Sequence, residues 1–161
     1  MQFFNPDGTT VQSFPQESKL ESEWIELLNY ARAATGKSYA PYSRFLVGVA
    51  IRLEDGTVVT GGNQENASYP LCMCAERVAL YAATAVHPGK KIRELAVIAH
   101  RAGIVDLVPA TPCGACRQVL VEFEQNQHDP IRIVLFGPAR AYYLLPSASA
   151  LLPMAFDRNS L

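Results

Sequence analysis

Two short cysteine motifs constrain the fold of this chain more than any other feature, because they have to meet in space if they share one metal ion. The first is the Cys-Ala-Glu run at residues 74–76, and the second is the Pro-Cys-Gly-Ala-Cys run at residues 112–116. Three thiolates can hold a zinc ion tetrahedrally and leave the fourth position to water, which a catalytic site requires. The sequence therefore predicts a catalytic zinc site with the ligands Cys74, Cys113 and Cys116.

Both motifs stand where helices are expected to begin. The partial positive charge of a helix N-terminus stabilises thiolates and lowers the pKa of cysteine. Cys113 and Cys116 are three positions apart, so they can face the same side of a first helical turn. We therefore expect the ligands to lie at the starts of two helices that approach one another.

Glu76 lies two positions after the first expected ligand. A carboxylate in a first helical turn is favoured by the helix dipole alone, so its position has a structural explanation. A hydrolytic zinc site also needs a group that moves protons, because zinc lowers the pKa of bound water to about 7 and a carboxylate can take and return that proton. The motif as a whole predicts that Glu76 is catalytic.

Three neighbouring features leave alternatives open. Cys72 could act as a fourth ligand and close the site, although a buried free thiol fits a catalytic centre better. Arg77 could donate hydrogen bonds to the ligand sulfurs and offset their negative charge, or it could be a solvated helix residue. The pair Cys113 and Cys116 alone would also suit a thioredoxin-like redox motif, but no βαβ pattern adjoins it.

The composition favours a small neutral substrate. The 161 residues suit one domain with a real core, and the high apolar content of 49% predicts a homo-oligomer that covers exposed apolar surface. The net charge is −1, and no cluster of basic residues stands out, which disfavours binding to nucleic acid. Neither a secretory signal nor a membrane-spanning run is expected, so we predict a cytoplasmic protein with reduced cysteines.

The pattern of apolar residues predicts an α/β fold with one mixed, five-stranded sheet and helices on both of its faces. Residues 1–17 show no periodicity and are expected to form a flexible arm before a single domain at residues 18–161. The first helix is expected to begin at a capping box formed by Ser18 and Glu21. The predicted elements are helices near 18–36, 74–87 and 114–125, a short last helix after residue 146, and strands at 45–53, 57–60, 95–99, 131–136 and 141–145. The last two strands must be antiparallel, because their connection is too short for a crossover.

Five sequence motifs together resemble those of a known protein family, and they occur in the order found in that family. They are Tyr-Ala-Pro-Tyr-Ser-Arg-Phe at 39–45, Asn-Gln-Glu-Asn-Ala-Ser-Tyr at 63–69, Cys-Ala-Glu-Arg at 74–77, Pro-Cys-Gly-Ala-Cys-Arg-Gln at 112–118 and Leu-Leu-Pro-Met-Ala-Phe at 151–156. Through these motifs the chain resembles the small homotetrameric zinc-dependent cytidine deaminases of nucleoside salvage. The resemblance implies a three-layer cytidine-deaminase-like fold, one Zn²⁺ per subunit, and hydrolysis of cytidine and 2′-deoxycytidine to the uridine products and ammonia.

The same resemblance assigns roles to individual residues. It implies that Glu76 moves the protons and that Asn63 and Glu65 hydrogen-bond the ribose, chiefly its 3′-hydroxyl. It further implies that Phe45 packs on the base and that the backbone of Ala75 holds the pyrimidine edge. Phe156 would reach into the active site of a neighbouring subunit, although it could also be a core aromatic residue of a terminal helix.

Other functions remain as alternatives at this point. One is deamination of a modified cytosine nucleoside of the blasticidin type, and another is editing of cytosine in RNA or DNA, which the neutral composition disfavours. A third, from a different class, is a catalytically silent zinc-binding interaction module. The intact Glu76 argues against the silent module, because such a protein would not need it.

Overall fold

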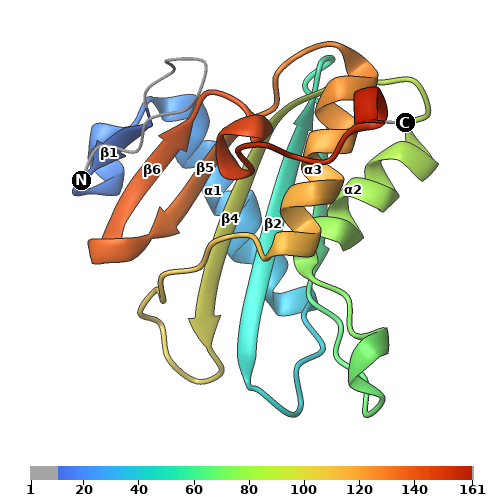
Figure 1. The fold of residues 1–161 in the computed structure, drawn as a ribbon. Helices are drawn as coiled ribbons and strands as arrows, with labels where there is room; N and C mark the ends of the chain where they lie inside the picture. The colour runs from blue at the N-terminus through green and yellow to red at the C-terminus, as the bar shows by residue number, and fades with distance from the viewer. Residues whose placement is uncertain (1–10, 161) are drawn as a thin grey trace.

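The computed structural model describes residues 11–160 and shows one mixed sheet between two layers of helices (Figure 1). The strand order is β1-β6-β5-β4-β2-β3, and β4 and β5 form the parallel pair of the sheet. The strands are β1 (Gln12–Phe14), β2 (Phe45–Leu53), β3 (Val58–Gly62), β4 (Ile92–Arg101), β5 (Arg132–Gly137) and β6 (Ala141–Leu145). The helices are α1 (Ser22–Ala34), α2 (Ala75–Val86) and α3 (Gly114–Gln127).

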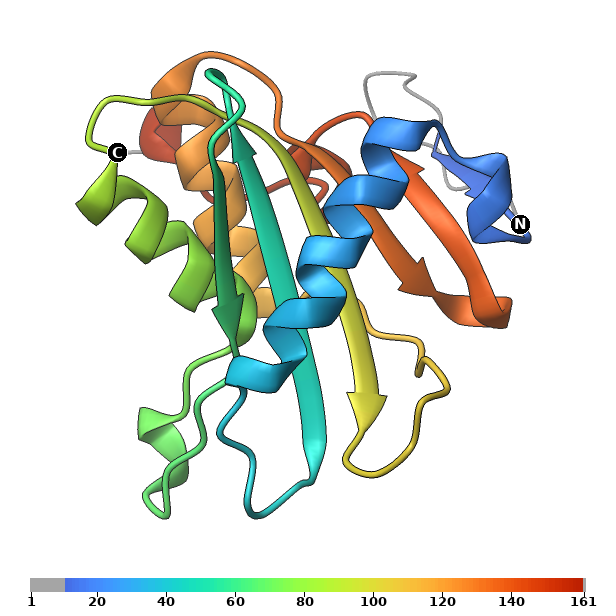
Figure 2. The same cartoon turned by 180° about the vertical axis from the view of Figure 1, so that it is seen from behind.

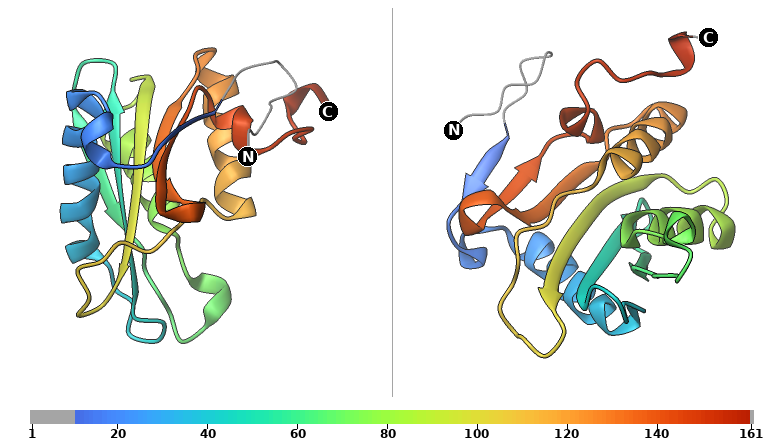
Figure 3. Two further views of the ribbon diagram at one scale, coloured as in Figure 1. Left: turned by 90° about the vertical axis from the view of Figure 1, so that its left-hand side faces the viewer. Right: turned by 60° about the horizontal axis from the view of Figure 1, so that its bottom comes forward.

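The helices divide between the two faces of the sheet. Helix α1 crosses one face, as the view from behind shows (Figure 2), and α2 and α3 lie together on the other face. Seen edge-on, the sheet stands as a middle layer between α1 and α3 (Figure 3). The three-layer α/β class predicted from the sequence is therefore confirmed.

One strand more is present than the sequence predicted. Residues 12–14, which were expected to belong to a flexible arm, form β1 and pair antiparallel with the edge strand β6. Residues 1–10 of the expected arm lie outside the described part of the chain. The predicted antiparallel pairing of the last two strands is confirmed, with Gly137 opposite Ala141 at the turn.

The predicted capping box does not form. Ser18 lies inside a short 3-10 helix, Glu17–Lys19, and α1 begins four residues later with Glu21 as its N-cap and no side-chain cap bond. The physical reason lies in Glu17, whose carboxylate accepts hydrogen bonds from Arg32 of α1 and from the hydroxyl of Tyr142 on β6. These contacts fix the approach to the helix from the side of the sheet.

The predicted last helix is replaced by short 3-10 turns. The turns Ala148–Leu151 and Arg158–Ser160 flank an irregular stretch that contains Phe156. Among residues 11–160, no helix is long and apolar enough to cross a membrane.

The core consists of one apolar cluster on each face of the sheet. Leu80 of α2 and Leu120 of α3 pack on one face, and Trp24 and Leu28 of α1 pack on the other. The strands β4 and β5 are buried on both faces, which explains their nearly continuous apolar sequences. This arrangement fixes α2 and α3 next to one another on the same side of the sheet.

A glycine lets α2 lie unusually close to the sheet. A Cβ atom at Gly61 of β3 would stand 2.7 Å from the amide nitrogen of Ala79 and 2.8 Å from the carbonyl oxygen of Ala75. A side chain at this position would therefore push the first turn of α2 outward. That first turn carries the Cys-Ala-Glu motif.

Candidate active site

Three cysteine sulfurs meet where α2 and α3 begin. Cys74 is the N-cap of α2, Cys113 is the N-cap of α3, and Cys116 lies in the first turn of α3. The Sγ atoms of Cys74 and Cys113 are 3.8 Å apart, and those of Cys113 and Cys116 are 3.5 Å apart. All three ligand atoms lie within 4.8 Å of one another.

These distances fit a zinc ion. Four ligands in a tetrahedron at the usual Zn–S distance of about 2.3 Å place neighbouring sulfurs about 3.8 Å apart. The two sulfur–sulfur contacts that involve Cys113 are close to this edge length. Three protein ligands leave one tetrahedral position for water or substrate, so the donor set fits a catalytic rather than a closed structural site.

The pKa values of the cysteines and the position of Arg77 also favour binding of a cation at the three sulfurs. Hydrogen bonds from Cys116 and Arg77 lower the pKa of Cys74 to about 5. The hydrogen bond with Cys74 and burial together raise the pKa of Cys116, and the nearby negative charges of Glu76 and Cys74 raise it further. The guanidinium Nη2 of Arg77 lies 3.9 Å from the Cys74 sulfur, while its Nε is buried without a hydrogen-bond partner in the described residues. A divalent cation bound by the three sulfurs would offset the negative charge that they carry as ligands.

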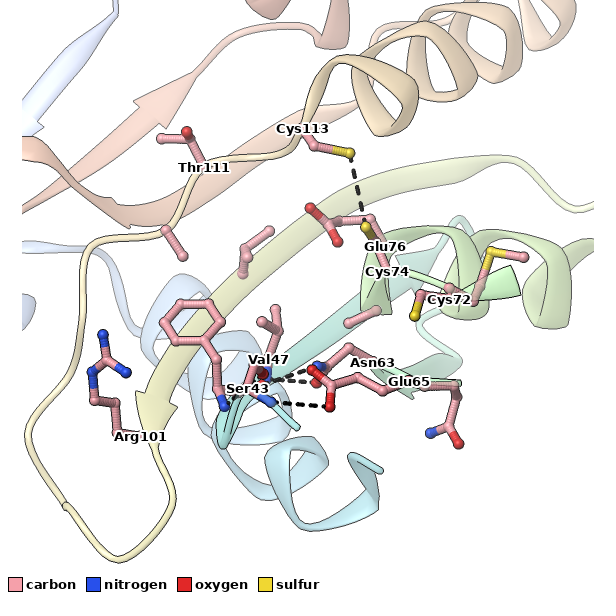
Figure 4. Close-up of a pocket in the computed structure, with 16 residues that line it drawn as sticks. Ser43, Val47, Asn63, Glu65, Cys72, Cys74, Glu76, Arg101, Thr111 and Cys113 are labelled. Carbon is pink, nitrogen blue, oxygen red and sulfur yellow. Dashed lines mark hydrogen bonds between the residues drawn. The ribbon is translucent and has the colours of Figure 1, made fainter. Parts of the chain in front are cut away.

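Glu76 lies beside the sulfur cluster and faces the same cavity (Figure 4). Its side chain belongs to the first turn of α2, and the residue is only 5% exposed. Burial raises the pKa of this carboxyl above its ordinary value, because the charged form loses its hydration. A carboxyl in this condition can take up and release a proton more readily near neutral pH.

The cavity next to Glu76 has a volume of about 550 Å³, which is within the usual range of small-molecule sites. Figure 4 shows Cys74, Cys113 and Glu76 in one part of it and Asn63 and Glu65 in another. Of the residues predicted to contact substrate, four line this cavity: Phe45, Asn63, Glu65 and Ala75. The structure thus brings together segments that are distant in the sequence.

Glu65 is fixed by the loop that precedes β2. Its Oε2 atom accepts hydrogen bonds from the amides of Tyr42, at 2.9 Å, and Ser43, at 3.2 Å. The hydrogen bonds from Ser43 and from the Tyr42 amide lower the pKa of Glu65, so it is ionised at neutral pH. An ionised carboxylate is a strong acceptor for a hydroxyl donor.

Asn63 is bonded to the backbone of β2. Its Oδ1 accepts from the Val47 amide at 2.9 Å, and its Nδ2 donates to the Phe45 carbonyl, also at 2.9 Å. The side chain therefore continues the hydrogen-bonding ladder past the end of β3 and holds β2 beside the cavity. One lone pair and one N–H of the amide are still free of these two bonds and can serve a ligand.

Two predicted possibilities are decided by the positions of the side chains. Cys72 lines the cavity but stands apart from the metal cluster: its sulfur lies 3.2 Å from the Asn66 amide nitrogen, which donates to it. The alternative of a fourth ligand is therefore not supported. Phe156 does not line the cavity and is 63% exposed, so it is not a core residue of a terminal helix.

Some residues of the site were not singled out in the sequence. The amides of Tyr42 and Ser43 hold Glu65, yet only Phe45 of the motif at 39–45 was given a role. Arg101 and Thr111 also line the cavity. The motif at 39–45 could have indicated a role for Tyr42 and Ser43, because it contains them. Nothing in the sequence pattern distinguishes Arg101 or Thr111.

The fold and the site define a class before any relative is considered. A sheet that carries two helices on one face, three cysteine sulfurs at the helix starts and a buried carboxyl beside them fits a zinc-dependent hydrolase.

Comparison with known proteins identifies the family within this class. The family model described as "Cytidine and deoxycytidylate deaminase zinc-binding region" matches residues 22–128. The cytidine deaminase of Sporosarcina psychrophila is 37% identical over 137 residues, which are 84% of this chain and 93% of the relative. That of Mycobacterium tuberculosis is 38% identical over 140 residues, 85% of this chain and 97% of the relative.

A solved structure agrees with these sequence matches. The crystal structure of cytidine deaminase from Burkholderia pseudomallei is 42% identical, has a TM-score of 0.69, and is matched over 85% of this chain and 100% of its own. The chain described here belongs to the cytidine and deoxycytidylate deaminase family, whose members are hydrolases that act on C–N bonds and use zinc as their cofactor.

Proposed function

We propose that this protein hydrolyses cytidine and 2′-deoxycytidine to uridine and 2′-deoxyuridine and releases ammonia, as in pyrimidine salvage. The observation that carries the proposal is the meeting of three thiols and the buried Glu76 at one cavity. The names of the relatives, each called a cytidine deaminase, support the choice of substrate.

In this proposal Cys74, Cys113 and Cys116 hold one Zn²⁺ per subunit, and Arg77 offsets part of their negative charge. When bound there, Zn²⁺ supplies a water molecule whose pKa is lowered to about 7. Burial keeps Cys116 and Glu76 in a region of low polarity, where electrostatic interactions are stronger than in water.

Glu76 moves the protons of the reaction. Its carboxylate accepts a proton from the water whose oxygen bonds to C4, and it gives that proton to N3 of the pyrimidine. It then transfers the second proton of this oxygen to the amino group at C4. The C4–N bond breaks, ammonia leaves and the carbonyl of uridine remains. The raised pKa of Glu76 supports this role, because a group that must both accept and donate a proton is most effective when its pKa is close to the ambient pH.

The remaining cavity residues bind and orient the nucleoside. We propose that Phe45 packs on the base, that the backbone of Ala75 holds the pyrimidine edge, and that Asn63 and Glu65 bind the 3′-hydroxyl. An ionised Glu65 fixed by two amides is a suitable acceptor for that hydroxyl. Neither Asn63 nor Glu65 then contacts the 2′ position of the sugar, so the site accepts both cytidine and 2′-deoxycytidine.

We also propose a homotetramer in which Phe156 enters the active site of a neighbouring subunit. The exposed position of Phe156 supports this, as do the exposed apolar side chains of Tyr69 and Leu71 in the segment before Cys74. The single domain would comprise residues 18–161, and residues 12–14 of the preceding segment add strand β1 to its sheet. The four free cysteines favour a cytoplasmic location.

The test uses the purified protein with and without its zinc. Incubation with cytidine should lower the absorbance of the cytosine band and release one ammonia per uridine formed, and prior removal of zinc with a chelator should stop both. 2′-Deoxycytidine should react at a similar rate. A protein that carries one zinc per chain and leaves both nucleosides unchanged would contradict the proposal.

A further inference from the structure

Helix α3 binds the C-terminal segment, which we define as residues 148–157, through four side chains on one side of the helix. These side chains form two pairs with a spacing of seven residues, which places the members of each pair two turns apart on the same side. The pairs are Arg117 with Glu124 and Gln118 with Gln125. The same helix carries two of the three zinc ligands at its start.

Glu124 anchors the beginning of the C-terminal segment. It is 8% exposed, and its carboxylate accepts hydrogen bonds from the amides of Ala148, at 2.6 Å, and Ser149, at 3.0 Å. The same carboxylate accepts from the hydroxyl of Ser149 and from the amide of Ile131 before β5. A buried carboxylate with this many donors fixes the segment firmly to α3.

Two glutamines hold the other end of the segment. Gln118 donates from Nε2 to the carbonyl of Phe156 at 2.8 Å, and Gln125 donates to the carboxylate of Asp157 at 3.0 Å. The segment therefore runs across α3 from its anchored start at Ala148 to Asp157.

Arg117 makes a different kind of contact, because it connects this segment to the zinc site. Its Nε donates to the carbonyl of Pro112 at 2.8 Å, and its Nη1 donates to the carbonyl of Leu151 at 3.0 Å. Pro112 is buried and directly precedes Cys113. One planar guanidinium thus joins the backbone next to a zinc ligand to the backbone of the C-terminal segment.

The loop before α3 needs such support. Cys113 is the exposed member of the three ligands, whereas Cys116 is buried and Cys74 is half-buried. Between β4 and α3, backbone hydrogen bonds from Val108 and Ala110 tie the loop to the sheet, and both lie upstream of Pro112. The contact from Arg117 holds the last residue before the ligand.

We propose that Arg117 is a positioning residue that holds the Cys113 loop in its zinc-binding geometry by bracing it against the C-terminal segment. This inference rests on the coordination given under Proposed function. Its consequence is that the last residues of the chain contribute to zinc retention without touching the metal. Partners outside the ligand set commonly change metal affinity about 10- to 100-fold.

The experiment measures the rate at which zinc-loaded protein releases its metal to a chromogenic chelator. Arg117→Ala should release zinc about 10- to 100-fold faster than the wild type. A truncation after Ala150, which removes the Leu151 carbonyl, should also accelerate release, and combining the two changes should add little, because both break the same brace. Gln118→Ala is the matched control: it loses only the contact to Phe156 and should release zinc within about twofold of the wild-type rate.

Circular dichroism would confirm that each variant is folded. If Arg117→Ala does not fold, Arg117→Gln, which keeps part of the stem but cannot bridge two carbonyls, carries the same prediction. Release at the wild-type rate by the Arg117 variant, or full additivity with the truncation, would overturn the proposal. Failure of the wild-type protein to load zinc would overturn the coordination itself, and it is distinguishable because release is measured without reference to turnover.

Discussion

The Sγ atoms of Cys74 and Cys113 lie 3.8 Å apart, although each belongs to the N-terminal end of a different helix. Their contact depends on the sheet, which carries α2 and α3 side by side on one face. The zinc site is therefore a product of the whole α/β arrangement rather than of either motif alone.

Replacement of a single ligand tests this arrangement. Cys113→Ala should reduce bound zinc from one ion per chain to near zero at micromolar zinc, because two thiolates hold zinc much more weakly than three. Cys72→Ala is the matched control, since the Cys72 sulfur contacts the backbone of Asn66 and not the cluster. Metal analysis after gel filtration measures both. Equal zinc loss in the two variants would contradict the assignment of ligands.

The close approach of α2 to the sheet makes Gly61 a sensitive position. Gly61→Ala should lower the free energy of unfolding by about 1–3 kcal/mol, because the new methyl group meets backbone atoms of α2. It should also weaken zinc binding, since the displaced turn carries Cys74. Gly36→Ala serves as the control, because a Cβ there meets nothing within 4 Å. Denaturant unfolding and zinc titration measure the two effects. Unchanged stability and zinc binding in Gly61→Ala would contradict the prediction and show that α2 can shift away from the sheet at no cost.

Substrate binding should depend on the charge of Glu65. Glu65→Gln should raise KM about 10- to 100-fold and change kcat much less, because a charged hydrogen bond to a hydroxyl is worth about 1.5–3 kcal/mol and the ribose does not react. The loss should be equal for cytidine and 2′-deoxycytidine. Steady-state kinetics with both nucleosides measures it. A loss confined to cytidine would mean that Glu65 contacts the 2′-hydroxyl instead.

A buried carboxylate on the face of the sheet that α1 covers should contribute to the free energy of unfolding. Glu94 is 2% exposed and forms ion pairs with Arg52, at 2.6 Å, and with Arg132, whose guanidinium also lies over the ring of Trp24. Glu94→Gln should cost about 1–3 kcal/mol, because the two arginines lose their common partner.

The exposed Glu26 provides the comparison for this ion-pair network. Glu26 also pairs with Arg52, but its side chain is 62% exposed, so Glu26→Gln should cost less than about 1 kcal/mol. Denaturant unfolding of the two variants measures the difference. Equal costs would show that the burial of Glu94 is energetically unimportant.

Local patterns in the sequence were sufficient for most of the fold. Strands β2 and β6 have the predicted bounds, because their apolar runs end at clear turn residues. Strand β1 could not be foreseen, because Gln12–Phe14 is only three residues long and its partner β6 is distant in the sequence. The capping box failed for a similar reason: tertiary contacts of Glu17, not local capping, determine where α1 begins.

The site was predictable to the extent that its motifs are continuous in the sequence. The three cysteines and Glu76 form compact motifs, and the structure places them together. The bridge from Arg117 to Leu151 was not foreseen, because it depends on how the C-terminal segment crosses α3. The bonds of Asn63 to the backbone of β2 were also missed, since they require the register of that strand.

The role of Glu76 is the centre of this account, and Glu76→Gln tests it most directly. The amide has nearly the same shape as the carboxyl but cannot carry the proton, so the fold and the zinc should remain. The measurement is the initial rate of absorbance loss with cytidine, together with the zinc content of the same sample. The account predicts a kcat at least about 100-fold lower with one zinc still bound per chain. A variant that keeps both its zinc and a rate near that of the wild type would contradict it.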